Sequence, residues 1–264
     1  MSHKKNRSKK VLPIITDTPY VEKKQDKSRF VPQREKLEWK MNIRERSDLT
    51  ERQKVILEAA EQKNCRAVMI DGVWGSSKSF LAILASLKLL NAGKVDQILY
   101  CRLPVPATQH GKIGFLAGSV EEKMAPYNAV LYEKLEEFLP KPEVDKLIKE
   151  NRIECINAGF VQGRSFACKA IIVDECASID WATLLLLISR CGEFTRIFFI
   201  GDTANQVYLS QYSGFRRFFE TFDDDDSKKN GVFCFELKQN SDIVRSGFLR
   251  WVMDKISKTQ PIIS

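Results

Sequence analysis

The residues best suited to chemistry in this sequence are Lys78 and Ser79, which end the glycine-containing stretch 71–79. Four apolar residues (67–70) precede this stretch and predict a buried strand, and apolar residues at helical spacing follow it from 80 to 90. A loop between a strand and a helix offers backbone N–H groups and the positive helix end to phosphates. Lys78 would neutralise phosphate oxygens, and the Ser79 hydroxyl is a ligand for Mg²⁺. The predicted nucleotide loop comprises Gly72, Val73, Trp74, Gly75, Ser76, Ser77, Lys78 and Ser79.

The residue before the lysine departs from the usual phosphate-loop pattern. That pattern has glycine at this position, whereas this chain has Ser77. A positive φ angle there costs a residue other than glycine about 1 kcal/mol or more. The alternative interpretation of the whole stretch is a tight strand-to-helix turn with an ordinary lysine.

Two adjacent carboxylates, Asp174 and Glu175, follow a second apolar run at 170–173. They end a predicted strand, and open parallel sheets bind ligands at the carboxyl ends of their strands. With a phosphate loop upstream, Asp174 is predicted to hold Mg²⁺ and Glu175 to polarise the attacking water as general base. The alternative is an acidic strand end followed by the cap of a helix over 181–189.

Two glutamines are further candidates for nucleotide contacts. Gln206 follows an apolar strand predicted at 196–200, where a polar side chain can sense the γ-phosphate, hold the water or cap a helix. Gln53 lies three residues after Thr50, which fits a capping box for a helix running to about 62. The alternative for Gln53 is that its amide binds the adenine edge, as a glutamine before the first strand does in helicase-like ATPases.

The remaining patterns predict an α/β fold, with apolar strands that do not alternate and that are separated by helices. The strand predicted at 97–101 lies between loop and carboxylates in the chain, which suggests a P-loop class with an inserted strand and a catalytic glutamate. The acidic run 223–226 is predicted to be a solvated loop. Further strands are predicted at 153–156 and 232–235, and helices at 121–139, 144–149 and from 242 onward.

Positive charge is concentrated at the N-terminus. Residues 1–46 hold 14 Lys/Arg and 6 Asp/Glu, so their net charge is +8. This equals the net charge of all 264 residues. Tyr20, Phe30 and Trp39 lie among these charges, as in segments that stack bases while cations follow phosphates. We expect this weakly structured segment to bind RNA or single-stranded DNA. The alternative is a solubilising tail that packs a few aromatic rings on the domain.

Composition excludes several classes of protein. The seven cysteines form no C-x-x-C and there are two histidines, so neither a zinc site nor a disulfide framework is expected. No run of 18 apolar residues and no signal-like start occurs. We therefore expect a soluble, cytoplasmic protein that does not bind membranes.

Together these motifs resemble the PhoH family of P-loop ATPases. The similarity is most specific in Arg102-x-Pro104, Lys112-Ile113-Gly114-Phe115-Leu116-x-Gly118 and Glu121-Glu122-Lys123-Met124-x-Pro126-Tyr127. Gly163-Arg164, Gly201-Asp202 with Gln206, Ser213-Gly214 and Asp242-Ile243-Val244-Arg245 also fit. Two features depart from the family pattern, namely Ser77 and Cys176-Ala177-Ser178, which stands where alanine-glutamine-asparagine is usual.

The resemblance implies a single RecA-like domain, with a mainly parallel sheet, helices on both faces and the nucleotide at the carboxyl ends of the strands. It also implies that this domain hydrolyses Mg·ATP. Lys78 would stabilise the β/γ oxygens, Ser79 and Asp174 would hold the metal, Glu175 would activate water and Gln206 would couple to the γ-phosphate. Arg245 is the first candidate for the arginine that stabilises transition-state charge, and Arg164 is the second. We expect a basic extension over 1–47, the ATPase domain over 48–258 and a tail over 259–264.

Activity on nucleic acid would require self-assembly, because superfamily 1 helicases use two RecA-like lobes and this chain has room for one. We expect a homo-oligomer, with a ring as the leading arrangement. The alternative function is a nucleotide-binding switch or assembly factor that hydrolyses weakly, which Ser77 and the missing glutamine favour. A small-molecule kinase is a third alternative that fits Glu175 less well.

Overall fold

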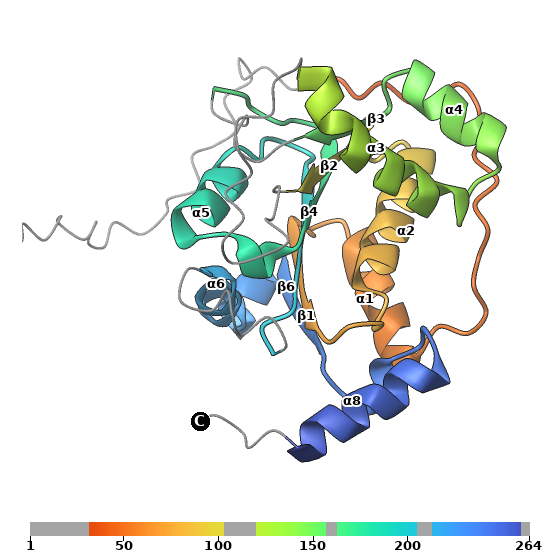
Figure 1. Ribbon diagram of the computed structural model, residues 1–264. Coiled ribbons are helices and arrows are strands. Elements are labelled where there is room, and N and C mark those ends of the chain that lie inside the picture. Colours follow the sequence, from red (N-terminus) through yellow and green to blue (C-terminus); the bar gives the residue numbers. More distant parts are fainter. Residues whose placement is uncertain (1–31, 103–119, 157–162, 205–212, 260–264) are drawn as a thin grey trace, which may run out of the picture. The chain divides into compact units, whose positions relative to one another are not determined.

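A six-stranded parallel sheet forms the centre of the computed structural model, which describes residues 32–102, 120–156, 163–204 and 213–259 (Figure 1). The order across the sheet is β3-β2-β4-β5-β1-β6, and every neighbouring pair is parallel. The mainly parallel sheet predicted from the sequence is confirmed. The strands are β1 (Ala67–Gly72), β2 (Gln97–Arg102), β3 (Ile153–Ile156), β4 (Lys169–Asp174), β5 (Arg196–Gly201) and β6 (Val232–Leu237).

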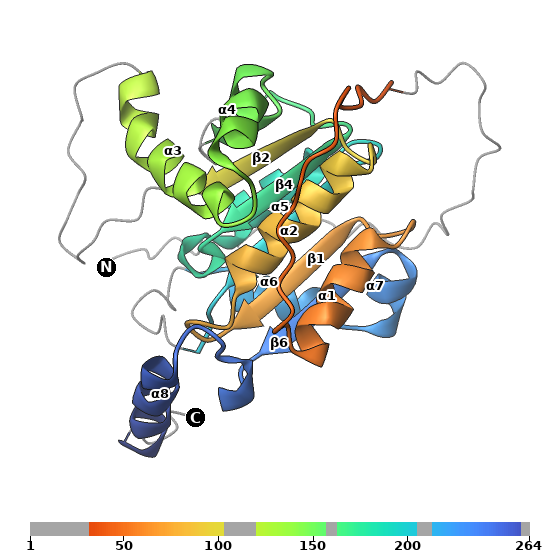
Figure 2. The same cartoon turned by 90° about the vertical axis from the view of Figure 1, so that its right-hand side faces the viewer.

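Helices cover both faces of the sheet, as predicted. One face carries α1 (Glu51–Glu61), α2 (Lys78–Asn91), α3 (Val120–Glu136) and α4 (Lys141–Lys149), and the other carries α5 (Trp181–Ser189) and α6 (Phe215–Phe222) (Figures 1 and 2). The short helix α7 (Asp225–Lys229) packs beside β6, and α8 (Gly247–Thr259) follows a 3₁₀ turn at Asn240–Asp242.

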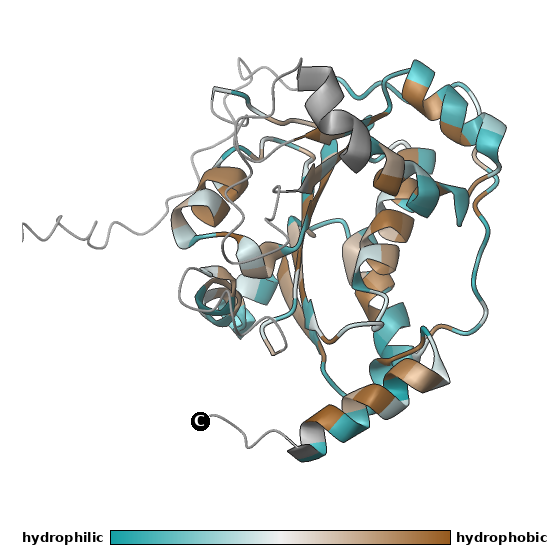
Figure 3. Ribbon diagram, viewed as in Figure 1, coloured by the Kyte–Doolittle hydropathy of each residue, from teal (hydrophilic) through white to brown (hydrophobic). Residues whose placement is uncertain are grey.

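Successive residues of each central strand contribute to two separate cores. In β1, Val68 and Ile70 pack with α1 and α2, whereas Met69 packs with the residues of α5 and α6. Apolar surfaces of the helices accordingly face the sheet on both sides (Figure 3). Both strand faces are buried, which explains why the strands are continuous apolar runs in the sequence.

The strand order decides which loops meet. β5 lies between β1 and β4, so the carboxyl ends of these three strands are neighbours at one edge of the sheet. The strand predicted at 97–101 is β2, which pairs with the opposite side of β4. The strand inserted between the loop strand and the carboxylate strand is therefore β5, whereas chain order had suggested β2.

Three local predictions need correction. No helix was predicted over residues 215–222, where the structure has α6. The acidic run 223–226 was predicted to be a solvated loop, but it contributes to α7, because the Asp224 carboxylate accepts the backbone N–H of Ser227 at 2.7 Å. The last helix begins at Gly247 rather than at 242. The Asp242 carboxylate closes the 3₁₀ turn instead, accepting from the Gln239 N–H at 2.8 Å.

The compact unit begins at Pro32, so residues 32–46 of the expected basic extension belong to it. They run along α2 (Figure 2), and the Trp39 indole donates to Glu150 at 3.1 Å while Lys146 lies 4.3 Å from its ring centroid. For Trp39, this packing supports the alternative of aromatic rings held on the domain. Tyr20 and Phe30 lie outside the described residues.

The expectation of no disulfide framework is confirmed, since all seven cysteine side chains are free thiols. Burial raises the pKa of Cys65 to about 11 and of Cys101 to about 12, so these two are unreactive near neutral pH. Among the helices of the described ranges, none combines the length and the apolar character that crossing a bilayer requires.

Candidate functional site

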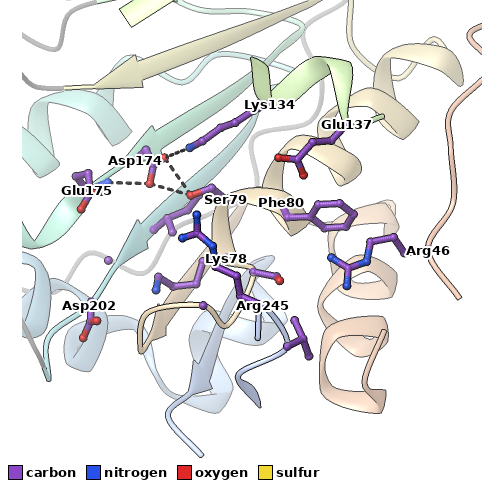
Figure 4. A pocket seen from close by; sticks show the side chains of 15 residues that line it. Arg46, Lys78, Ser79, Phe80, Lys134, Glu137, Asp174, Glu175, Asp202 and Arg245 are labelled. Atoms are coloured by element: carbon purple, nitrogen blue, oxygen red, sulfur yellow. Dashed lines mark hydrogen bonds and ion pairs between the residues drawn. The ribbon is translucent and has the colours of Figure 1, made fainter. Parts of the chain in front are cut away.

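A cavity of about 500 Å³ lies at the carboxyl edge, where β1, β4 and β5 end (Figure 4). The phosphate loop forms its floor, and the strand ends, α3 and the segment before α8 form its walls. Its lining residues are Arg46, Gly75, Ser77, Lys78, Ser79, Phe80, Lys134, Glu137, Asp174, Glu175, Ile200, Gly201, Asp202, Val244 and Arg245.

The phosphate loop has the backbone that its sequence predicts. Gly72 passes so close to β6 that a Cβ atom would lie 2.8 Å from the Leu237 carbonyl oxygen. Gly75 has a φ of 78°, and Ser77 is left-handed with φ 64° and ψ 23°. Ser77 thus adopts the conformation that glycine usually supplies before the lysine, and α2 begins directly after it.

Lys78 occupies the loop it would use to hold phosphate. Its ammonium donates to the carbonyl oxygens of Gly72 at 2.7 Å and Val73 at 2.9 Å. Burial lowers the pKa of Lys78, although the negative charges of Asp202 and Asp174 oppose that shift. An incoming phosphate would replace the two carbonyl oxygens as acceptor and would also supply opposite charge.

Ser79 and Asp174, the predicted metal ligands, are in contact. The Ser79 hydroxyl lies 3.0 and 3.2 Å from the two Asp174 carboxylate oxygens. Burial raises the pKa of Asp174, but the Lys134 charge and hydrogen bonds from Tyr100, Lys134 and Ser79 outweigh it and hold that pKa below its usual value. Hydroxyl and carboxylate oxygens suit Mg²⁺, which keeps water and substrate phosphates as its other ligands. The described residues contain no group of three or more His, Cys, Asp or Glu side chains placed to hold a metal ion.

Glu175 and Arg245 both line the cavity, as their predicted roles require. Glu175 has a φ of 59°, a conformation that costs a residue other than glycine about 1 kcal/mol or more and that is frequent at functional sites. The segment carrying Arg245 is attached to the phosphate loop, because the Val244 N–H donates to the Gly75 carbonyl oxygen at 3.1 Å. Arg245 therefore reaches the cavity from the same chain.

Gln53 is buried and its amide is engaged. It forms the predicted capping box with Thr50, and its Nε2 donates to the Ser76 carbonyl oxygen at 3.3 Å. In this conformation Gln53 supports the phosphate loop and does not line the cavity, which favours the capping interpretation over adenine binding.

Several other candidates lie away from the cavity or outside the described residues. Trp74 is 45% exposed and Val73 is buried, and neither is among the lining residues. Arg164 lies 3.6 Å from Glu154 and is not part of the lining. Gln206 falls outside the described residues, so its role stays a prediction.

Sequence reasoning missed Lys134, Asp202 and Arg46 as lining residues. Asp202 follows an apolar strand directly, as Asp174 does, so the same strand-end signal applies to it. Arg46 lies with its guanidinium 5.1 Å from the Phe80 ring centroid, and Lys134 contacts Asp174 at 3.1 Å. No local pattern marks these two, because helix packing and the N-terminal segment bring them to the site.

The comparisons with known proteins agree with this geometry. A family model described as PhoH-like protein matches residues 46–257. The chain belongs to the PhoH-like protein family. This family consists of P-loop proteins related to nucleotide hydrolases, which agrees with a phosphate loop at the edge of a parallel sheet.

Similar PhoH-like proteins come from several bacteria. A PhoH-like protein of Synechocystis sp. is 27% identical over 191 residues, covering 72% of this chain and 56% of that protein. Protein PhoH2 of Mycolicibacterium smegmatis is 27% identical over 157 residues, covering 60% and 36% of the two chains. A PhoH-like protein of Bacillus subtilis is 28% identical over 134 residues, covering 50% and 41%. The matched region thus spans roughly a third to just over half of these relatives.

Proposed function

We propose that this PhoH-like protein is a Mg²⁺-dependent ATPase that acts with RNA or single-stranded DNA in the cytoplasm. The observation that carries the proposal is the convergence of Lys78, Ser79 and Asp174 in one cavity at the carboxyl edge of the sheet. These three side chains supply the cation and the oxygen ligands that a metal–triphosphate complex needs. Glu175 at the same edge adds a carboxylate suited to polarising water.

Each residue has one task in the proposed reaction. Lys78 leaves the carbonyl oxygens of its loop and neutralises the β/γ-phosphate oxygens. Ser79 and Asp174 would hold Mg²⁺, which would neutralise phosphate charge in the cavity. Glu175 accepts a proton from the attacking water, and Arg245 stabilises the charge that develops on the transferred group. Gln206 is proposed to sense the γ-phosphate.

Two features support a single-stranded nucleic acid as partner. One is the excess of basic residues in 1–46, which gives salt-sensitive affinity for phosphates. The other lies on α8, where Phe248 and Trp251 are 73% and 56% exposed and their ring centroids lie 6.0 Å apart in a stacked arrangement. Lys255 follows on the same side of the helix, so bases and phosphates would both find contacts there.

A homo-oligomer, with a ring as the leading arrangement, is part of the proposal. In the proposed assembly, movement along a nucleic acid would use closure of this α/β lobe against the lobe of a neighbouring copy. In the proposed ATPase the arginine comes from the same chain, a choice supported by the position of Arg245 in the cavity lining. Sedimentation analysis with and without Mg·ATP tests the assembly.

Steady-state ATP hydrolysis with and without single-stranded RNA tests the function. Lys78→Ala should abolish turnover, and Glu175→Gln should lower kcat by about 10²-fold or more while nucleotide still binds. RNA should stimulate the wild type, and rising salt should weaken that stimulation. Deleting residues 1–31, which leaves the compact unit intact, should reduce the response to RNA. Equal rates with and without RNA would remove the nucleic-acid part of the proposal.

The second candidate function is a nucleotide-binding switch or assembly factor with weak hydrolysis. Serine in a left-handed conformation at position 77 favours it, because the loop carries strain that the family's glycine avoids. Under this alternative Glu175→Gln leaves turnover unchanged, while Lys78→Ala still abolishes nucleotide binding. The pair of variants therefore separates the two functions.

A further inference from the structure

Lys134 holds the carboxylate that the proposed function assigns to the metal. It projects from α3 into the cavity, and its ammonium lies 3.1 Å from Asp174 Oδ2 and 3.0 Å from the Tyr100 hydroxyl (Figure 4). The Asp174 side chain is 7% exposed and that of Lys134 is 29% exposed. The contact is thus a largely buried ion pair with one partner reachable from solvent.

Asp174 has no acceptor position left over. Oδ1 accepts from the Glu175 N–H at 3.0 Å and lies 3.2 Å from the Ser79 hydroxyl. Oδ2 lies 3.0 Å from the same hydroxyl and also accepts from Tyr100 and Lys134. A carboxylate offers about four lone-pair directions. A metal ion held by Ser79 and Asp174 would replace the hydrogen bond between these two side chains, and it would then lie beside the Lys134 ammonium, which carries like charge.

The charges that line the cavity are balanced before any ligand enters. The lining has four cationic and four anionic side chains, namely Arg46, Lys78, Lys134 and Arg245 against Glu137, Asp174, Glu175 and Asp202. A divalent metal alone would add positive charge beside the Lys134 ammonium. A metal bound to a nucleoside triphosphate brings net negative charge and gives a displaced ammonium new acceptors in its phosphate oxygens.

We propose that Lys134 is a tethered cation that competes with Mg²⁺ for Asp174, so that the site accepts the metal only together with a nucleoside triphosphate. This inference rests on the proposed function, which places the metal at Asp174. The long, flexible stem of lysine lets its ammonium leave the carboxylate without movement of α3. Metal-free Asp174 is meanwhile never left as a buried, unpaired charge, which would destabilise the fold.

Binding of Mn²⁺ to the nucleotide-free, full-length protein tests the proposal, with electron paramagnetic resonance as readout. Lys134→Met should bind Mn²⁺ at least 10-fold more tightly than the wild type, because the competitor is gone. Lys134→Arg, which keeps the charge, should bind it as weakly as the wild type. Adding Asp174→Asn to Lys134→Met should remove the gained site. Equal Mn²⁺ affinity in the wild type and in Lys134→Met would overturn the proposal.

Two controls keep the result interpretable. Lys141→Met removes a positive charge from the start of α4, where the side chain is 73% exposed and lies 3.7 Å from Glu136, and it should leave Mn²⁺ affinity unchanged. If Lys141→Met gained as much Mn²⁺ affinity as Lys134→Met, the gain would come from the change in net charge alone. That result would overturn the proposal. If Lys134→Met does not fold, Lys134→Gln replaces it and the same criterion applies.

Failure of this inference and failure of the proposed function give different results. The Mn²⁺ assay contains no nucleotide, so it reports on Lys134 and Asp174 even if the protein never hydrolyses ATP. A 10-fold gain without any ATPase activity would leave the inference standing and refute the enzyme. Activity with no gain would refute the inference alone.

Discussion

Replacing Ser77 by glycine should stabilise the fold. Ser77 precedes α2 with a φ of 64°, and its hydroxyl forms no capping hydrogen bond, so the substitution removes no contact of that kind. A left-handed conformation costs a residue with a Cβ atom about 1–2 kcal/mol, whereas glycine adopts it freely. The native loop thus carries strain that a single substitution relieves.

The net gain is smaller than the relieved strain. Glycine gives the unfolded chain more conformations, which costs about 0.4–1 kcal/mol of stability. The difference leaves a gain of about 0.5–1 kcal/mol in the free energy of unfolding. For a domain of this size, that gain raises the melting temperature by about 1–4 °C.

Urea unfolding of the nucleotide-free protein, followed by circular dichroism, measures this change. Ser77→Ala is the matched control, because alanine keeps the Cβ atom and should change stability little. Gly75→Ala should shift the midpoint the opposite way, since its φ is 78° and a Cβ atom there would lie 2.4 Å from Leu249 Cδ2. If Ser77→Gly is no more stable than Ser77→Ala, the argument from backbone strain is wrong.

Further predictions concern the close backbone contact, a buried ion pair and acid stability. Gly72→Ala should lower the free energy of unfolding by about 1–3 kcal/mol in urea titrations, because its Cβ atom would lie 2.8 Å from the Leu237 carbonyl oxygen. Asp242→Ala should lower the free energy of unfolding by about 2 kcal/mol, and Arg52→Ala should lower it by less than about 1 kcal/mol. The reason is that the Asp242 carboxylate is buried, whereas the Arg52 guanidinium, 3.3 Å away, is half exposed. Equal losses in the two variants would contradict this prediction. The pKa of Asp174 is lowered in the folded state, so its charge stabilises the fold above the ordinary aspartate pKa. That contribution is lost as the pH falls below about 4, and Asp174→Asn should flatten this part of the melting-temperature profile.

Elements that depend on local spacing could be predicted from the sequence. The apolar strands, the glycine-containing loop, the capping box of Gln53 and the strand-end pair Asp174-Glu175 could all be predicted, because each is set by residues close together in the chain. Lys78 and Ser79 followed directly, since their position at the start of α2 is fixed by the loop. Even the left-handed conformation of Ser77 was expected from the motif it interrupts.

Tertiary structure alone decided which of these elements are neighbours. The position of β5 between β1 and β4 follows from packing of whole strands, and chain order had pointed to β2. The contact of Lys134 with Asp174 bridges 40 positions of the chain and depends on how α3 lies against the sheet. The physical reason is that a local pattern reports which face of an element is buried, but which partner covers that face is set by the competition among all elements for one core.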